Sequence, residues 1–150
     1  MHIAAFVATI GVFLGVVGPW VTLGKLGSRS GIYYTHGLIM LAPVAVMAAA
    51  SFYAMILRRT KKPVPWQLVV TYLSMGIIVA VYAFWMKGQV EYEVNGIAAK
   101  FRLATDSLLG WGITSLPWTS GAVTLAGIMA FFMPGDVGGT DDSLERRRLG

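Results

Sequence analysis

The chain from Trp66 to Met86 reads WQLVVTYLSMGIIVAVYAFWM and contains no Asp, Glu, Lys or Arg. About 20 helical residues, each rising ~1.5 Å, cross a bilayer core of ~30 Å. Three other stretches of similar length also lack charge: Ile3–Leu23, Gly37–Leu57 and Leu108–Met133. The sequence therefore predicts an all-α membrane protein. We expect a four-transmembrane-helix bundle over residues 1–134, with spans at about 3–23, 37–57, 66–86 and 112–133.

Composition narrows the function classes. The chain has 150 residues, is 56% hydrophobic, contains no Cys and carries a formal charge of +5. Without Cys there are no disulfides, thiol nucleophiles or iron–sulfur clusters. Pumps and ion pathways usually keep ionisable groups inside the membrane, and these spans have none. Since the positive charges lie beside the spans, we expect contact with anionic lipids and no nucleic-acid partner.

The distribution of positive charge predicts the orientation. The connection after the second span reads Arg58-Arg59-Thr60-Lys61-Lys62, and Arg146, Arg147 and Arg148 lie in the tail. Short loops rich in Lys and Arg stay in the cytoplasm. The sequence thus predicts a multi-pass protein of the bacterial cytoplasmic (inner) membrane with both termini cytoplasmic. The outer loops are then 24–36 and 87–111. The polar composition of residues 135–150 predicts a flexible cytoplasmic tail, whose arginines would contact lipid or a partner.

Small residues mark a packing face on the first span. The residues at steps of four and three are Ala4, Ala8, Gly11, Gly15 and Gly18. Small side chains let transmembrane helices approach closely, because apolar burial between helices gains little in lipid. This face could dock a partner protein or could pack inside the bundle, and the sequence leaves both alternatives open.

The second outer loop predicts a β-hairpin over residues 89–102, because polar and apolar residues alternate on both sides of Asn95-Gly96. In that register Val90, Tyr92 and Phe101 share an apolar face that needs a cover. A third strand at Gly31–Thr35 could supply the cover, and so could a partner protein. On the opposite face, Glu91 and Glu93 would lie together, balanced by Lys100 and Arg102.

Candidate chemistry is sparse. His36 could hold a pigment or a metal through a single bond, but an interfacial residue that hydrogen-bonds the loop is the reading we favour. His2 is expected at the headgroup level of the opposite face, too far away to share a ligand with His36. No Ser or Thr has an adjacent His to activate it. We therefore predict no catalytic residues, no resident cofactor and no metal. A lipid cavity is an alternative, and its lining would be Tyr53, Gln67, Tyr72, Tyr82 and Trp85.

The segment Gly18-Pro19-Trp20-Val21, followed by Thr35-His36-Gly37, resembles an arrangement in uncharacterised small bacterial four-span membrane proteins. Those proteins often have Pro-Trp-Val at the exit of the first helix and Asp-Gly at the entry to the second, where this chain has His36. The topology is also similar to that of claudin-type four-span proteins, which have extracellular β structure. The characteristic cysteine pair of that family is absent here, so no function is transferred from it.

These observations favour one function and leave alternatives open. We expect a non-catalytic accessory or structural subunit of a larger bacterial membrane protein complex, whose partners are other membrane subunits. It would dock through small-residue helix faces and the outer hairpin. The alternative is a lipid- or small-molecule-binding membrane protein or transporter component. An enzyme at the outer interface is a third hypothesis, with His36, Glu91 or Asp106 as its candidate residues.

Overall fold

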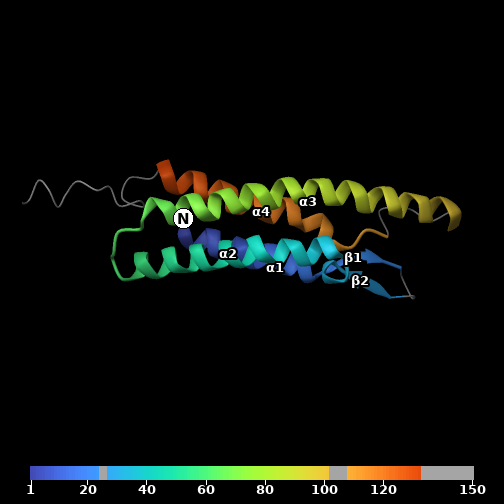
Figure 1. Ribbon diagram of the computed structural model, residues 1–150, viewed down its shortest axis with the longest axis horizontal. Helices are drawn as coiled ribbons and strands as arrows, with labels where there is room; N and C mark the ends of the chain where they lie inside the picture. Colours follow the sequence, from blue (N-terminus) through green and yellow to red (C-terminus); the bar gives the residue numbers. More distant parts are fainter. Residues whose placement is uncertain (24–26, 102–107, 133–150) are drawn as a thin grey trace, which may run out of the picture.

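The computed structural model describes residues 1–23, 27–101 and 108–132. In chain order, the elements are α1 (His2–Val17), β1 (Pro19–Thr22), β2 (Ser28–Ser30), the short 3-10 helix η2 (Gly31–Tyr33), α2 (Thr35–Arg59), α3 (Trp66–Phe101) and α4 (Trp111–Phe132). The four α-helices run side by side as an elongated bundle (Figure 1). One end holds the start of α1, the connection from α2 to α3, and the end of α4. The other end, called the cap end below, holds both strands and the last turns of α3.

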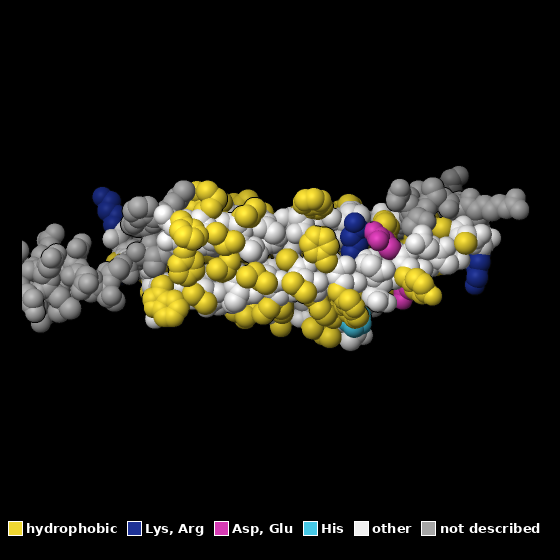
Figure 2. Space-filling model, turned by 90° about the horizontal axis from the view of Figure 1, so that it is seen from above, with side chains coloured by type: hydrophobic (Ala, Val, Ile, Leu, Met, Phe, Trp, Pro, Cys, Tyr) yellow, Lys and Arg dark blue, Asp and Glu magenta, His cyan; other side chains and the backbone are white. Residues whose placement is uncertain are grey.

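Three helices, α2, α3 and α4, are long and apolar enough to cross a membrane. In contrast, α1 has 16 residues, or ~24 Å at ~1.5 Å per residue, which is less than a ~30 Å hydrocarbon core. Hydrophobic side chains cover much of the middle of the visible face in Figure 2, and charged side chains lie on either side of this region. The protein is thus mostly helical, with apolar helices suited to a membrane.

The first helix ends well before its uncharged stretch does. Gly18 has an extended backbone, with φ −64° and ψ 169°, and β1 begins at Pro19. Proline lacks the N–H that would continue the helix, and its ring disfavours helical geometry at the preceding residue. The predicted span over 3–23 is therefore wrong at its carboxyl end. A lack of charged residues indicates that a segment is apolar, but it does not indicate the residue at which a helix ends.

The structure has a β-hairpin, but it lies between α1 and α2. β1 falls at the end of the first uncharged stretch, and β2 falls in the connection that follows it. β1 pairs antiparallel with β2, with Pro19 opposite Ser30 and Thr22 opposite Ser28, and the register is irregular between Pro19 and Val21. A third segment extends this pair on the other side of β1. The Thr22 N–H donates to the Leu108 carbonyl at 2.8 Å, and the Gly110 N–H donates to the Trp20 carbonyl at 2.8 Å. We call β1, β2, η2 and residues 108–110 the cap.

The predicted hairpin over 89–102 is wrong, because α3 continues as one helix to Phe101. Val90, Val94 and Ala98 are buried, and their spacing of four residues places them on one helical face. An established helix adds residues without a new nucleation cost, so covering this face is enough to continue α3 through Asn95-Gly96. The strand expected at Gly31–Thr35 is also wrong. Residues 31–33 form η2 and α2 begins at Thr35.

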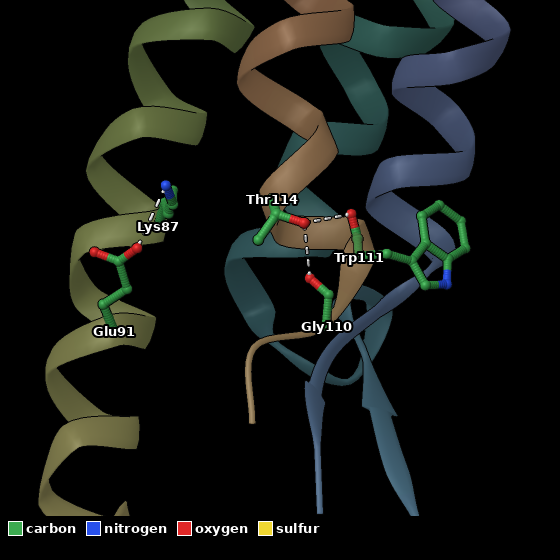
Figure 3. Close-up of polar contacts among 5 residues, drawn as sticks. All are labelled: Lys87, Glu91, Gly110, Trp111 and Thr114. Atoms are coloured by element: carbon green, nitrogen blue, oxygen red, sulfur yellow. Dashed lines mark hydrogen bonds and ion pairs between the residues drawn. The ribbon is translucent and has the colours of Figure 1, made fainter. Parts of the chain in front are cut away.

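Glycines on α1 bring it against α4. A Cβ placed on Gly11 would lie 3.0 Å from Thr119 Cγ2, and one on Gly15 would lie 2.9 Å from the Leu116 side chain. At Gly18 it would lie 2.8 Å from the Trp111 ring, whose side chain is directed toward α1 in Figure 3. This is the small-residue packing expected of helices in lipid, and it takes place inside the bundle.

Hydroxyl groups on α4 are satisfied within the helix. Thr114 donates to the Gly110 and Trp111 carbonyls (Figure 3), and Ser120 donates to the Leu116 carbonyl at 2.6 Å. Thr119 and Thr124 bond in the same manner to carbonyls four residues earlier. Such back-bonding removes the cost of an unpaired hydroxyl in hydrocarbon. The polar residues of α4 are thus accounted for by the helix itself.

Candidate functional site at the cap end

An aromatic group joins the start of α2 to α3. His36 Nδ1 and the Tyr82 hydroxyl oxygen lie 2.5 Å apart. The His36 ring meets the Trp85 ring edge to face, with 5.6 Å between centroids and an interplanar angle of 75°. Tyr82 and Trp85 also contact each other at 5.5 Å. We expected His36 to form a hydrogen bond with the loop. Its observed hydrogen-bond partner is instead Tyr82 on α3.

Tyr34 is held from the opposite side by the cap. Its ring stacks on Trp20, with 5.5 Å between centroids and an interplanar angle of 17°. Trp20 is fully buried, and its indole N–H donates to the Gly15 carbonyl at 3.1 Å. Gly31 leaves room for this indole, because a Cβ there would overlap both the ring and the Val16 carbonyl. The end of α1 and the start of α2 are thereby fixed to each other.

A cavity of about 130 Å³ lies beside this aromatic group. Its lining residues are Tyr34, His36, Trp85, Met86, Gln89, Val90 and Glu93. Apolar and aromatic walls with a few polar groups are typical of small-molecule sites. Sites for drug-sized ligands have ~300 Å³ or more, so this cavity accepts only a small chemical group.

The cavity has a negative side. Burial raises the pKa of the Tyr34 phenol above its ordinary value of 10.0, the Glu93 carboxylate raises it further, and Arg29 lowers it.

Glu91 is engaged elsewhere, in an ion pair with Lys87 at 3.4 Å (Figure 3). The interpretation that Glu91 and Glu93 share a face is therefore wrong, because residues two apart on a helix point in nearly opposite directions. Within the described ranges, no group of three potential metal ligands occurs.

A second His–Tyr contact lies toward the other end of the bundle. His2 Nδ1 and the Tyr72 hydroxyl are 3.1 Å apart, and His2 is only 2% exposed. His2 is buried because the first turn of α1 packs against α3, and its expected position at the headgroup level stays a prediction. Tyr72 and Tyr82 are ten residues apart on one helix, or ~15 Å. The two histidines are accordingly too far apart to share a ligand, as the sequence predicts.

The predicted interface residues of the first span separate into two groups. Gly11, Gly15 and Gly18 face α4, which is the internal-packing alternative for these three. Ala4 is exposed and Ala8 is half-buried. A partner contact at those two alanines stays a prediction.

The predicted interface residues of the outer loop also separate. Val90 is 2% exposed, whereas Tyr92 is 79% exposed. In a strand they would share a face, but on α3 they lie on nearly opposite sides. Nothing is described of the Phe101 side chain, and Arg146, Arg147 and Arg148 lie outside the described residues together with the predicted tail.

The cavity differs from the aromatic pocket that the sequence suggested. Only Trp85 of that set is among the described lining residues. Tyr72 contacts His2 instead. Tyr34, Gln89 and Glu93 were missed as lining residues. The signal for Gln89 and Glu93 was their helical spacing from Trp85 and Met86, which becomes visible only when α3 is continued past Met86.

No protein-family model matches this chain, and comparisons with curated proteins and with solved structures found no similar protein. The resemblance to small bacterial four-span proteins therefore stays a prediction. The function has to be argued from the residues of the chain itself.

Proposed function

We propose that this protein is a non-catalytic accessory or structural subunit of a larger bacterial membrane protein complex. The observation that carries the proposal is the exposure of Tyr92, at 79%, on the part of α3 beyond its uncharged stretch. Large exposed apolar side chains are ordinary where lipid surrounds a helix. Outside the hydrocarbon core, an exposed aromatic residue at the centre of an uncharged face indicates a protein contact.

The last turns of α3 project away from the membrane part. The helix has 36 residues, or ~54 Å, of which a bilayer core takes up ~30 Å. Lys87, Glu91, Glu93 and Lys100 all follow the uncharged stretch that ends at Met86. A helix of this kind offers a rigid surface for recognition, since its conformation need not be ordered on binding.

The two faces of this projection differ. The inner face, with Val90, Val94 and Ala98, is buried. The outer face carries Gly88, Tyr92, Gly96 and Ala99, all exposed and without charge. A Cβ on Gly88 or on Gly96 would meet no atom within 4 Å. We name these four residues the docking face.

The partner that fits is a second membrane subunit with an apolar or aromatic surface just outside the bilayer. The docking face has no charge to pair, whereas Lys87 and Glu91 at its side already pair with each other. Interfaces of this type are centred on a buried Tyr or Trp and bordered by polar residues. A partner surface rich in charge would leave its own groups unpaired on contact.

The orientation completes the proposal. The start of α1 and the connection over Arg58–Lys62 lie at one end of the bundle (Figure 1), and this end is proposed to face the cytoplasm. The cap end then lies outside the inner membrane. In this arrangement α1 is a fourth span. Because α1 is shorter than the hydrocarbon core, it crosses where the bilayer thins locally, which costs little per Å of mismatch.

The test is co-purification of the tagged full chain from native membranes in mild detergent. The wild-type chain is expected to retain a stable membrane protein partner, and Tyr92→Ala is expected to lower its recovery roughly tenfold or more, as loss of a central aromatic contact does. Tyr33→Ala is the control, because Tyr33 in η2 is equally exposed, at 80%, but lies outside the docking face. A monodisperse wild-type chain without a stable partner would refute the proposal.

A further inference from the structure

We propose that the cavity at the cap end binds an organic ammonium group, with the Glu93 carboxylate as its counter-ion and the rings of Tyr34 and Trp85 as its walls. This site is separate from the docking face and does not depend on a partner subunit.

The charges around the cavity select the sign of the ligand. Among the described lining residues, Glu93 is acidic and none is Lys or Arg. The Glu93 carboxylate would repel an anion at this position. Among the described residues, Glu93 makes no ion pair, and it lies in the lining of the cavity, where a bound cation would meet it.

Arg29 is the cation that could compete from within the chain. It lies on β2 and acts on Tyr34, but more weakly than Glu93 does. Arg29 is exposed and does not line the cavity. A ligand cation inside the cavity is therefore closer to the lining groups than the Arg29 guanidinium is.

The walls favour an organic cation over a metal ion. Aromatic rings attract ammonium groups through their negative faces, and several rings together form the cages that recognise substituted ammonium ions. Metal ions such as Ca²⁺ need six or more oxygen ligands, whereas the described lining has side-chain oxygens only on Tyr34, Gln89 and Glu93. The volume of about 130 Å³ suits a head group of a few heavy atoms.

The rings are held in place before any ligand arrives. His36 is bonded to Tyr82 and packs on Trp85, and Tyr34 is stacked on Trp20. Since both sides of the cavity are fixed by buried or half-buried contacts, binding costs little ordering of the lining.

The depth of the site allows two sources of the ligand. Trp85 and Met86 are the last residues of the uncharged stretch of α3, and Lys87 follows. Tryptophan at such a boundary lies among lipid headgroups. The shared chemistry is an ammonium group on a short carbon chain, which a zwitterionic lipid or a water-soluble amine can present.

The experiment uses the full chain in detergent and in lipid nanodiscs. Calorimetric titration with choline and with ethanolamine, at constant ionic strength, tests the soluble source. Native mass spectrometry of chain reconstituted in equal amounts of phosphatidylethanolamine and phosphatidylglycerol tests the lipid source. Glu93→Gln is the variant, since it removes the charge and keeps the shape. Glu91→Gln is the matched control, because Glu91 lies two residues away on α3 and outside the lining.

The outcomes are distinct. Binding of either soluble amine, weakened roughly tenfold or more by Glu93→Gln and unaffected by Glu91→Gln, supports the proposal with a soluble ligand. Retention of phosphatidylethanolamine over phosphatidylglycerol, lost only in Glu93→Gln, supports it with a lipid ligand. The proposal is overturned if neither probe binds, or if Glu93→Gln and Glu91→Gln behave alike. Since no partner enters these measurements, their result is independent of the co-purification test.

Discussion

At the scale of single residues, the packing around Trp20 is tight. Gly31 has no space for a side chain, because a Cβ would overlap the Trp20 indole and a backbone carbonyl. Gly31→Ala must displace one of these groups, and overpacking of this kind costs about 1–3 kcal/mol. We expect a lower thermal unfolding midpoint in detergent, together with a change in tryptophan fluorescence.

The control for that substitution is Gly121→Ala in α4, where a Cβ would meet no atom within 4 Å. Alanine is favoured over glycine inside a helix by up to ~1 kcal/mol. The unfolding midpoint of this variant should stay the same or rise. Equal losses of stability in both variants would contradict the packing described around Trp20.

The raised pKa of Tyr34 should make the stability of the protein depend on pH. Its pKa is raised above 10.0, mainly by burial and next by Glu93, so the folded protein keeps the phenol proton after the unfolded chain has lost it. Stability from this group is complete below pH 10 and is lost as the pH rises through the folded pKa. The unfolding midpoint should therefore fall more steeply above pH 10 in the wild type than in Tyr34→Phe. Identical slopes would show that Tyr34 makes no such contribution.

At the scale of elements, α3 shows where sequence reasoning failed. The start of the helix at Trp66 is predicted correctly, because Pro63 and Pro65 precede an uncharged run. Past Met86, the run Gln89–Val94 alternates like a strand, while Val90, Val94 and Ala98 also repeat at helical spacing. The segment therefore fits both a strand and a helix. Which of the two forms depends on which set of apolar side chains the rest of the protein covers. The structure brings β1 against α3, and a contact between elements so remote in sequence cannot be read from the local pattern.

Gly96 distinguishes helix from hairpin by the sign of a stability change. In a two-residue hairpin turn, Gly96 needs a positive φ, and Gly96→Ala would destabilise the turn. On an exposed helical face, with no atom within 4 Å of an added Cβ, the same change should stabilise the protein by up to ~1 kcal/mol. Thermal unfolding in detergent measures the direction. A lower midpoint would favour the hairpin over the helix.

At the scale of the whole molecule, the sequence predicts the starts of all four α-helices to within a few residues, whereas the ends of α1 and α3 are predicted wrongly. The aromatic site was less predictable. His36 and Tyr82 are 46 residues apart, and only the packing of α2 on α3 brings them together. Likewise, residues 108–110 join β1 through two backbone hydrogen bonds, and no local sequence pattern predicts this pairing. Lengths and polarity are local properties, whereas a site built from several helices depends on their rotation about their own axes.

The arrangement in the membrane makes a prediction of its own, because α1 decides whether the N-terminus and the cap lie on opposite sides. The natural chain has no Cys, so single cysteines report topology without background. Ser28→Cys in β2 and Lys62→Cys between α2 and α3 are both at exposed positions. If α1 crosses, a membrane-impermeant maleimide should label Ser28→Cys in spheroplasts, and should label Lys62→Cys only after permeabilisation. A tag before Met1 should then be protected from external protease like Lys62→Cys. A tag that is cleaved from outside while Lys62→Cys stays protected would mean that α1 does not span the membrane, since three crossings place the two ends of α1 on the same side as the cap.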